Sequence, residues 1–120
     1  MRDGLCLPIF FLVQLTMPAY SIVAVTVNDP DLFQRYVDGH QGTLAGFGGR
    51  FIVAGSEFEV LEGDWPGQIV VVHEWPDRRA FHAWHTSDDY RPWKEMRRAA
   101  ASATVVLVDG LPAGTGDDLG

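Results

Sequence analysis

The chain has few cysteines and few basic residues, and both shortages exclude classes of function. Its 120 residues include one cysteine, Cys6, which excludes an internal disulfide and any metal site built from several cysteines. Lysines and arginines number 9 against 16 aspartates and glutamates, and the net charge is −7. Because nucleic-acid binding needs a clustered basic surface, this balance argues against a nucleic-acid partner.

The sequence also lacks an apolar run long enough to span a membrane. Its most apolar stretch covers residues 5–15, which is shorter than a transmembrane helix. Arg2 ahead of this stretch is compatible with a secretory signal. Asp3, Pro8 and the bulky Met17 argue against that interpretation, because they disturb the charge, the apolar core and the cleavage site of a signal. We therefore expect no membrane partner and a cytoplasmic protein.

These observations set the expected domain limits. We predict that residues 1–16 are an apolar extension from an upstream start, outside the fold, with a cleaved signal or an arm packed on a partner as alternatives. Residues 17–111 are expected to form one domain, since a chain of this length can bury one modest core. Residues 112–120, rich in glycine and acids, are expected to be a flexible tail.

The first half of the domain predicts a strand followed by a helix. Residues 20–27 (YSIVAVTV) are rich in β-branched residues and end at Asn28, as a strand does. Asp29 and Pro30 are a typical helix start. Apolar residues and one histidine then recur at spacings of three and four, which predicts one buried helix face: Phe33, Tyr36, Val37, His40, Leu44 and Phe47. Gly46, Gly48 and Gly49 should end this helix by supplying a left-handed conformation.

The centre of the chain predicts a hairpin. Residues 51–54 form an apolar strand that breaks at Gly55, and we expect it to resume over Glu57–Leu61. The glycine-rich residues 62–67 then turn the chain into a second strand over residues 68–75. Glu57 and Glu59 alternate with Phe58 and Val60, which is typical of a solvated strand edge.

The last third predicts two short helical pieces and a final strand. Asp77 caps the first piece, residues 86–89 interrupt it, and residues 104–108 (TVVLV) form the strand. The order is β-α-β-β-α-β, an α+β fold with a four-stranded antiparallel sheet of ferredoxin-like plan. The strands are apolar on both faces, whereas the helices can cover only one. We therefore predict a homodimer with sheet packed against sheet.

The sequence also resembles a known family. The matching segments are PAYSIVAVTVNDPDLFQRYV, FGGRF, EVLEGDWPG, the spacing of Trp84, Ser87 and Tyr90, then Arg97 and VLVDG. Over residues 18–111 these resemble the uncharacterised domain-of-unknown-function family 1330 (DUF1330), within the dimeric α/β-barrel superfamily. The resemblance implies a ferredoxin-like subunit paired through its sheets, with a pocket between sheet and helices. It implies no reaction. His85 departs from the family, which commonly has tyrosine there.

Two side chains are the candidate catalytic residues. His40 lies on the apolar helix stripe, where an imidazole must find a partner or face a cavity, and it could act as a general acid or base. The alternative is a core-edge histidine bonded to a backbone carbonyl. Arg97 lies beside aromatic residues and could bind a carboxylate or enolate. Its alternative role is a salt bridge to Glu74 or Asp89.

Four further residues are candidates for substrate binding, and no cofactor is expected. Arg50 follows two glycines and could meet an anion, although a structural helix end is the competing interpretation of those glycines. Trp84, Tyr90 and Tyr20 could shape an aromatic pocket, or instead serve the core and the dimer interface. His82 and His85 lie three residues apart, but no third ligand is evident, so we expect no bound metal.

These residues support three hypotheses about function. The first is a small homodimeric, cofactor-free enzyme, isomerase-like or monooxygenase-like by analogy with the superfamily, that acts on a small carboxylated or aromatic molecule. The second is a dimer that binds such a molecule without turnover. The third is a dimeric barrel whose aromatic residues are purely structural.

Overall fold

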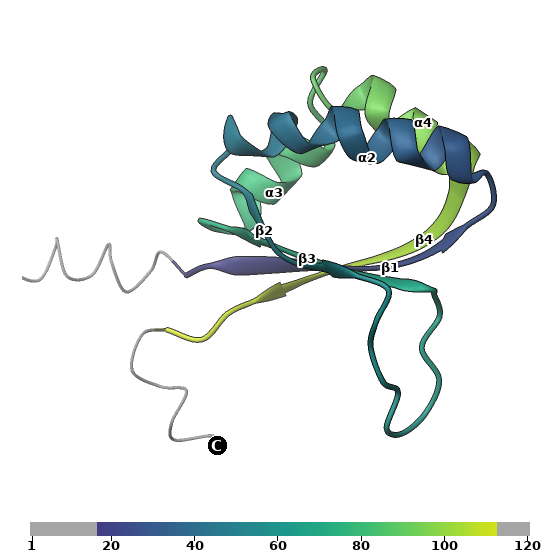
Figure 1. Cartoon of the computed structure of the whole chain (residues 1–120). Coiled ribbons are helices and arrows are strands. Elements are labelled where there is room, and N and C mark those ends of the chain that lie inside the picture. The colour runs from purple at the N-terminus through teal and green to yellow at the C-terminus, as the bar shows by residue number, and fades with distance from the viewer. Residues whose placement is uncertain (1–16, 113–120) are drawn as a thin grey trace, which may run out of the picture.

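A computed structural model describes residues 17–112 and shows a four-stranded antiparallel sheet with three helices over one face (Figure 1). The strands lie in the order β2-β3-β1-β4. The elements are β1 (Ala19–Val27), α2 (Pro30–Ala45), β2 (Arg50–Gly55), β3 (Ile69–Trp75), α3 (Arg78–His85), α4 (Arg91–Ala100) and β4 (Ala101–Asp109). This confirms the predicted α+β class, with the second helical region divided into two helices. Our predictions for residues 1–16 and 113–120 lie outside the described residues.

Helix α2 begins and packs as its sequence predicts. The Asp29 side chain accepts a hydrogen bond from the Leu32 amide at 3.1 Å, and Pro30 occupies the first turn. Tyr36, His40 and Leu44 are buried against the sheet. Of the three glycines predicted to end the helix, Gly48 supplies the left-handed conformation, with φ +82°, whereas Gly46 is right-handed.

The prediction that the first hairpin strand resumes over Glu57–Leu61 is wrong. Strand β2 ends at Gly55, and residues 56–68 form a loop that extends away from the sheet on the face opposite the helices (Figure 1). Within residues 17–112, no strand lies beside Glu57–Leu61 for it to pair with, because β3 pairs with β2 only along Arg50–Gly55. An isolated alternating segment cannot satisfy its backbone groups as a strand.

The two faces of the sheet have different surroundings. Ser21, Val23 and Val25 of β1 face the helices and are buried. On the opposite face, Val53, Val106 and Val108 are 46%, 49% and 42% exposed. The second face is therefore apolar and uncovered within the described subunit. No helix among residues 17–112 is long and apolar enough to cross a membrane.

Candidate functional site

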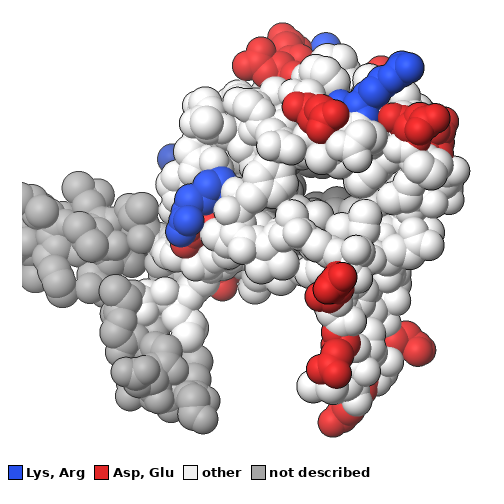
Figure 2. Space-filling view, in the orientation of Figure 1, with Lys and Arg blue, Asp and Glu red and all other residues white. Residues whose placement is uncertain are grey.

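A cavity of about 400 Å³ lies between the helices and the covered face of the sheet. Figure 2 shows a hollow between the helical layer and the sheet. Aromatic side chains supply much of its wall: Phe33, Tyr36, Phe51, Phe81, Trp84 and Tyr90. Valines and an isoleucine of the strands form the opposite wall. The polar side chains that reach it are His40, Gln41, His73, His85 and Arg97. An aromatic cavity with a few convergent polar groups is typical of a small-molecule site.

Arg97 is a buried cation without a carboxylate partner among residues 17–112. It lies in the last turn of α4 with 8% of its surface exposed. Its hydrogen bond is a long one, from Nε to the Tyr90 hydroxyl at 3.4 Å. No ion pair joins it to an acid among residues 17–112, so the predicted alternative of a salt bridge to Glu74 or Asp89 is wrong: Glu74 pairs instead with Arg50. A buried charge that lacks a counter-charge is costly, and it favours an anionic group in the cavity.

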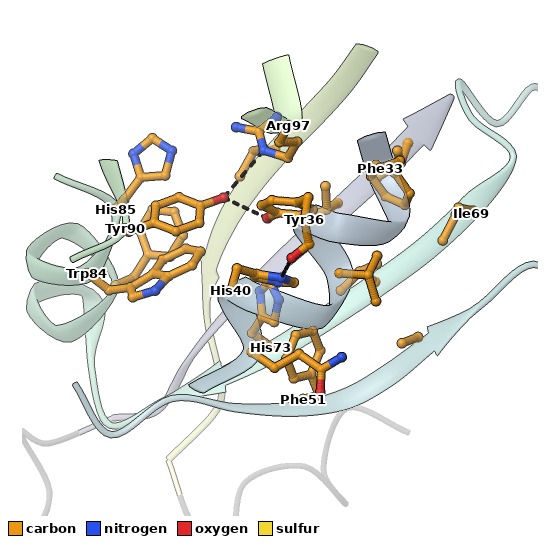
Figure 3. Close-up of a pocket in the computed structure, with 18 residues that line it drawn as sticks. Phe33, Tyr36, His40, Phe51, Ile69, His73, Trp84, His85, Tyr90 and Arg97 are labelled. Atoms are coloured by element: carbon orange, nitrogen blue, oxygen red, sulfur yellow. Dashed lines mark hydrogen bonds between the residues drawn. The ribbon is translucent and has the colours of Figure 1, made fainter. Parts of the chain in front are cut away.

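A chain of hydrogen bonds runs from the Arg97 guanidinium to Tyr90 and on to Tyr36 (Figure 3). Their hydroxyl oxygens are 2.7 Å apart, and both residues are buried. Burial, followed by the neighbouring Tyr90, raises the pKa of Tyr36 well above its usual range, so Tyr36 keeps its hydroxyl proton at neutral pH. One of the two hydroxyl protons forms the hydrogen bond between the two tyrosines. The other has no acceptor among the described residues and can be donated to a ligand.

Trp84 holds the Tyr90 ring in place. The two rings stack with centroids 3.8 Å apart and planes 27° apart. The Trp84 indole donates to Thr43 Oγ1 at 2.8 Å, which ties α3 to α2. The Tyr90 amide also donates to Ser87 Oγ at 3.1 Å. Both aromatic residues line the cavity, as we expected for a pocket.

His40 bonds to a backbone carbonyl and also lines the cavity. Its Nδ1 donates to the Tyr36 carbonyl at 2.7 Å, and its ring stacks on the Tyr36 ring with centroids 4.0 Å apart. It also lines the cavity, with 4% of its surface exposed. Burial lowers its pKa, so the imidazole is neutral at pH 7. Because Nδ1 carries the proton, Nε2 carries a lone pair and can accept a proton.

Tyr20 and Arg50 do not join this cavity. Both pair with Glu74, through a hydrogen bond from the Tyr20 hydroxyl at 3.1 Å and one from Arg50 Nε at 2.8 Å. Glu74 alternates with His73 and Trp75, which face the helices, so this trio lies on the other face of the sheet. Arg50 and Glu74 line a separate, smaller hollow. The structure thus separates these two predicted substrate-binding residues from the other four predicted site residues.

Sequence reasoning missed His73 as a residue of the cavity. It is 5% exposed on β3, and its Nδ1 lies 2.7 Å from Ser21 Oγ. Burial lowers its pKa to about 4, and nearby His40 contributes. The detectable signal was positional: Ser21 and His73 are polar interruptions at helix-facing positions of apolar strands.

His85 lines the cavity from the end of α3. It is half-buried, and its ring stacks on Phe81 with centroids 5.2 Å apart. Burial and the positive charges of Lys94 and Arg97 lower its pKa to about 4. Within residues 17–112, no three histidine, cysteine, aspartate or glutamate side chains gather as a metal site would require.

Three solved structures share the fold at low sequence identity. A protein of unknown function from Rhodopseudomonas palustris is 18% identical, with a TM-score of 0.66 and coverage of 87% of this chain and 92% of that chain. The cofactor-independent oxygenase SnoaB from Streptomyces nogalater is 18% identical, with a TM-score of 0.56 and coverage of 78% and 93%. A dimeric ferredoxin-like protein of unknown function from Thermobifida fusca is 16% identical, with a TM-score of 0.58 and coverage of 80% and 93%.

Likeness at this level of identity establishes a shared fold, and sequence comparison identifies the family. A comparison with curated proteins found no match. The family model described as "Domain of unknown function (DUF1330)" matches residues 18–111, which include every helix and strand described above. The chain therefore belongs to the DUF1330 family.

Proposed function

We propose that this chain is a homodimeric, cofactor-free enzyme, isomerase-like or monooxygenase-like, whose cavity binds a small aromatic or carboxylated molecule. The observation that carries the proposal is the buried Arg97 guanidinium, which has no acid partner among residues 17–112 and lies in an aromatic cavity. A flat anion would stack between the aromatic walls and supply the missing negative charge.

The chemistry would begin with a proton transfer. A neutral His40 can remove a proton from an acidic C–H or O–H bond of the bound molecule. Arg97 and the free hydroxyl proton of the tyrosine pair would then stabilise the resulting oxyanion or enolate. Returning the proton to another carbon completes an isomerisation. In an oxygenation, the electron-rich anion itself reduces dioxygen, and SnoaB, which shares this fold, is a cofactor-independent oxygenase.

The dimer is proposed from the uncovered face of the sheet. Its exposed valines are Val53 on β2 and Val106 and Val108 on β4, the two edge strands, and β3 and β1 lie between those strands in the sheet. A continuous apolar sheet face in water favours association with a second copy. The Thermobifida fusca protein of the same fold is described as dimeric, which agrees with this assembly.

The binding function is tested with an Arg97→Met variant in a thermal-shift screen against small carboxylates, phenols and enols. Methionine fills similar volume without the charge, so the empty variant should unfold at the same or a higher temperature than the wild type. At least one compound should raise the melting temperature of the wild type and fail to raise that of the variant. Arg98→Met is the matched control, because Arg98 is exposed on the same helix.

The possible outcomes separate the hypotheses. A loss of binding without a loss of stability supports a ligand-binding Arg97. A variant that simply melts at a lower temperature and binds as before would assign Arg97 to the fold and contradict the proposal. Turnover of a bound compound, lost in His40→Ala, then distinguishes the enzyme from a dimer that only binds.

A further inference from the structure

The His73 imidazole carries a polar atom that the fold does not use. Its Nε2 is buried and has no hydrogen-bond partner among the described residues, while the side chain lines the cavity. Buried polar atoms are nearly always hydrogen-bonded, because leaving one unpaired costs free energy. An unpaired atom on a side chain that lines the cavity therefore points to a partner that a bound molecule could supply.

Neighbouring hydrogen bonds determine which nitrogen of His73 carries the proton. The Trp75 indole can only donate, so Ser21 Oγ accepts its hydrogen bond at 2.9 Å. Ser21 is fully buried, and the partner for its own hydroxyl proton is His73 Nδ1 at 2.7 Å. His73 Nδ1 is thus an acceptor, and the proton of the neutral ring lies on Nε2. Ser21 and Trp75 together present a fixed N–H donor to the cavity.

His40 presents the complementary atom. Its Nδ1 donates to a backbone carbonyl, so its Nε2 carries a lone pair and makes no hydrogen bond within residues 17–112. Both imidazoles lie against the same ring: Phe51 is 5.6 Å from His40 and 4.7 Å from His73, measured between ring centroids. Figure 3 shows them together beside Phe51, with Arg97 farther along the cavity.

We infer that His73 and His40 form a donor–acceptor pair for one hydroxyl group of the ligand, which makes a phenol or an enol the class of molecule that this end of the cavity takes. The hydroxyl oxygen accepts from His73 Nε2–H, and the hydroxyl proton points to His40 Nε2. This inference rests on the proposed function and narrows its substrate class. A carboxylate does not fit the pair, because it lacks the proton that the His40 lone pair requires; it fits Arg97 instead.

The same pair can ionise the hydroxyl group. The O–H bond breaks, an N–H bond forms at His40 Nε2, and the oxygen keeps the electron pair as a phenolate or enolate. His73 Nε2–H remains bonded to that oxygen, and a hydrogen bond to an oxyanion is stronger than one to a neutral oxygen. His73 would therefore contact the substrate and stabilise the charge that His40 creates, and no oxidant or cofactor enters this step.

The test compares 4-nitrophenol with 4-nitroanisole, its methyl ether, as probes of the wild-type cavity. The ether can accept from His73 but cannot donate to His40, so we expect it to bind about tenfold more weakly, as the loss of one hydrogen bond predicts. Bound nitrophenol should also show the absorbance of the phenolate at a pH below its solution pKa. His73→Leu should weaken nitrophenol binding about tenfold and remove that absorbance, whereas His73→Gln, which keeps an N–H donor, should retain most of both.

His82→Gln is the matched control, because His82 is exposed on α3, and it should behave as the wild type. Nitrogen-15 NMR of the unmodified protein provides a readout that needs no variant: His73 should be protonated on Nε2 and His40 on Nδ1 at neutral pH. Equal affinity for phenol and ether, or a His73 proton on Nδ1, would overturn this inference and leave the proposed function standing. No binding of either probe by the wild type would count against both.

Discussion

Burial controls which side chains of the site carry charge. His40, His73 and His85 all have lowered pKa values, with desolvation as the largest cause, so the three imidazoles that line the cavity are neutral at pH 7. Arg97 remains the cation of the cavity because a guanidinium is not deprotonated in proteins. The site therefore offers neutral acceptors and donors for proton transfer beside one fixed positive charge.

The lowered pKa of His73 predicts how stability depends on pH. In the unfolded chain an imidazole titrates near 6.5, whereas in the folded protein the pKa of His73 is about 4. Above the unfolded value both states are neutral and the stability is complete. Between about pH 6.5 and 4 only the unfolded chain binds the proton, so the free energy of unfolding should fall as pH falls, by roughly 3 kcal/mol in total for this group.

Urea denaturation of the wild type and of His73→Gln across that pH interval measures this contribution. Glutamine does not titrate, so the variant should lose less stability than the wild type on acidification. His82→Gln should keep the wild-type dependence, since that imidazole is exposed. Parallel curves for wild type and His73→Gln would show that burial does not hold His73 neutral.

At the scale of elements, the junction between α2 and β2 couples the fold to the site. Gly49 lies against the Trp75 ring, where an added Cβ would come within 2.4 Å of a ring carbon. Trp75 cannot move easily, because it is buried and its indole donates to Ser21. Ser21 in turn bonds His73, so the glycine that permits this close approach also supports the orientation of a cavity residue.

Gly49→Ala should therefore destabilise the protein by about 2 kcal/mol, the usual cost of overpacking a core. The matched control is Gly46→Ala: Gly46 has a right-handed conformation, and no atom of the described residues lies within 4 Å of an added Cβ. This change should leave stability equal or raise it by about 0.5 kcal/mol. Thermal unfolding of the two variants measures the difference. Equal melting temperatures would mean that the Trp75 ring shifts without cost.

The sequence predicted elements where a periodic pattern coincided with its tertiary partner. The helix α2 and the β-branched strands were predicted correctly from their apolar patterns, because each of them has a layer to pack against. The alternation in Glu57–Leu61 was as regular, but none of the described strands lies beside it, and residues 56–68 form a loop with Leu61 83% exposed. Alternation indicates that a segment would suit a half-buried strand. The segment forms a strand only where the sheet provides a neighbouring strand.

The site was predictable to the extent that its residues lie on helix stripes. His40, Trp84, Tyr90 and Arg97 share faces with apolar neighbours, and the structure brings all four to one cavity. The positions of the strand residues could not be predicted in the same way, because they depend on how distant strands pair. The role of His73 depends on its pairing with Ser21, 52 residues earlier, and the same register places the predicted Tyr20 and Arg50 on the other face of the sheet.

At the scale of the whole molecule, the sheet has one occupied face and one face that the proposed dimer would cover. Val106 lies near the middle of β4 on the uncovered side, paired in register with Ile22 of β1, and is 49% exposed. In a dimer packed sheet against sheet, a lysine there would place its charge in an apolar interface without a partner. We expect Val106→Lys to be a folded monomer under conditions in which the wild type is a dimer.

Light scattering and sedimentation at micromolar concentration check this expectation, with circular dichroism to show that the variant is folded. Ala99→Lys is the matched control, because residue 99 is exposed on α4, in the helical layer, where the same charge should leave the dimer intact. A monomeric wild type, or a dimeric Val106→Lys, would show that the sheet face is not the interface. The cavity lies on the covered side of the sheet, so a folded monomer that still binds the ligand of the wild type would further show that each subunit contains a complete binding site.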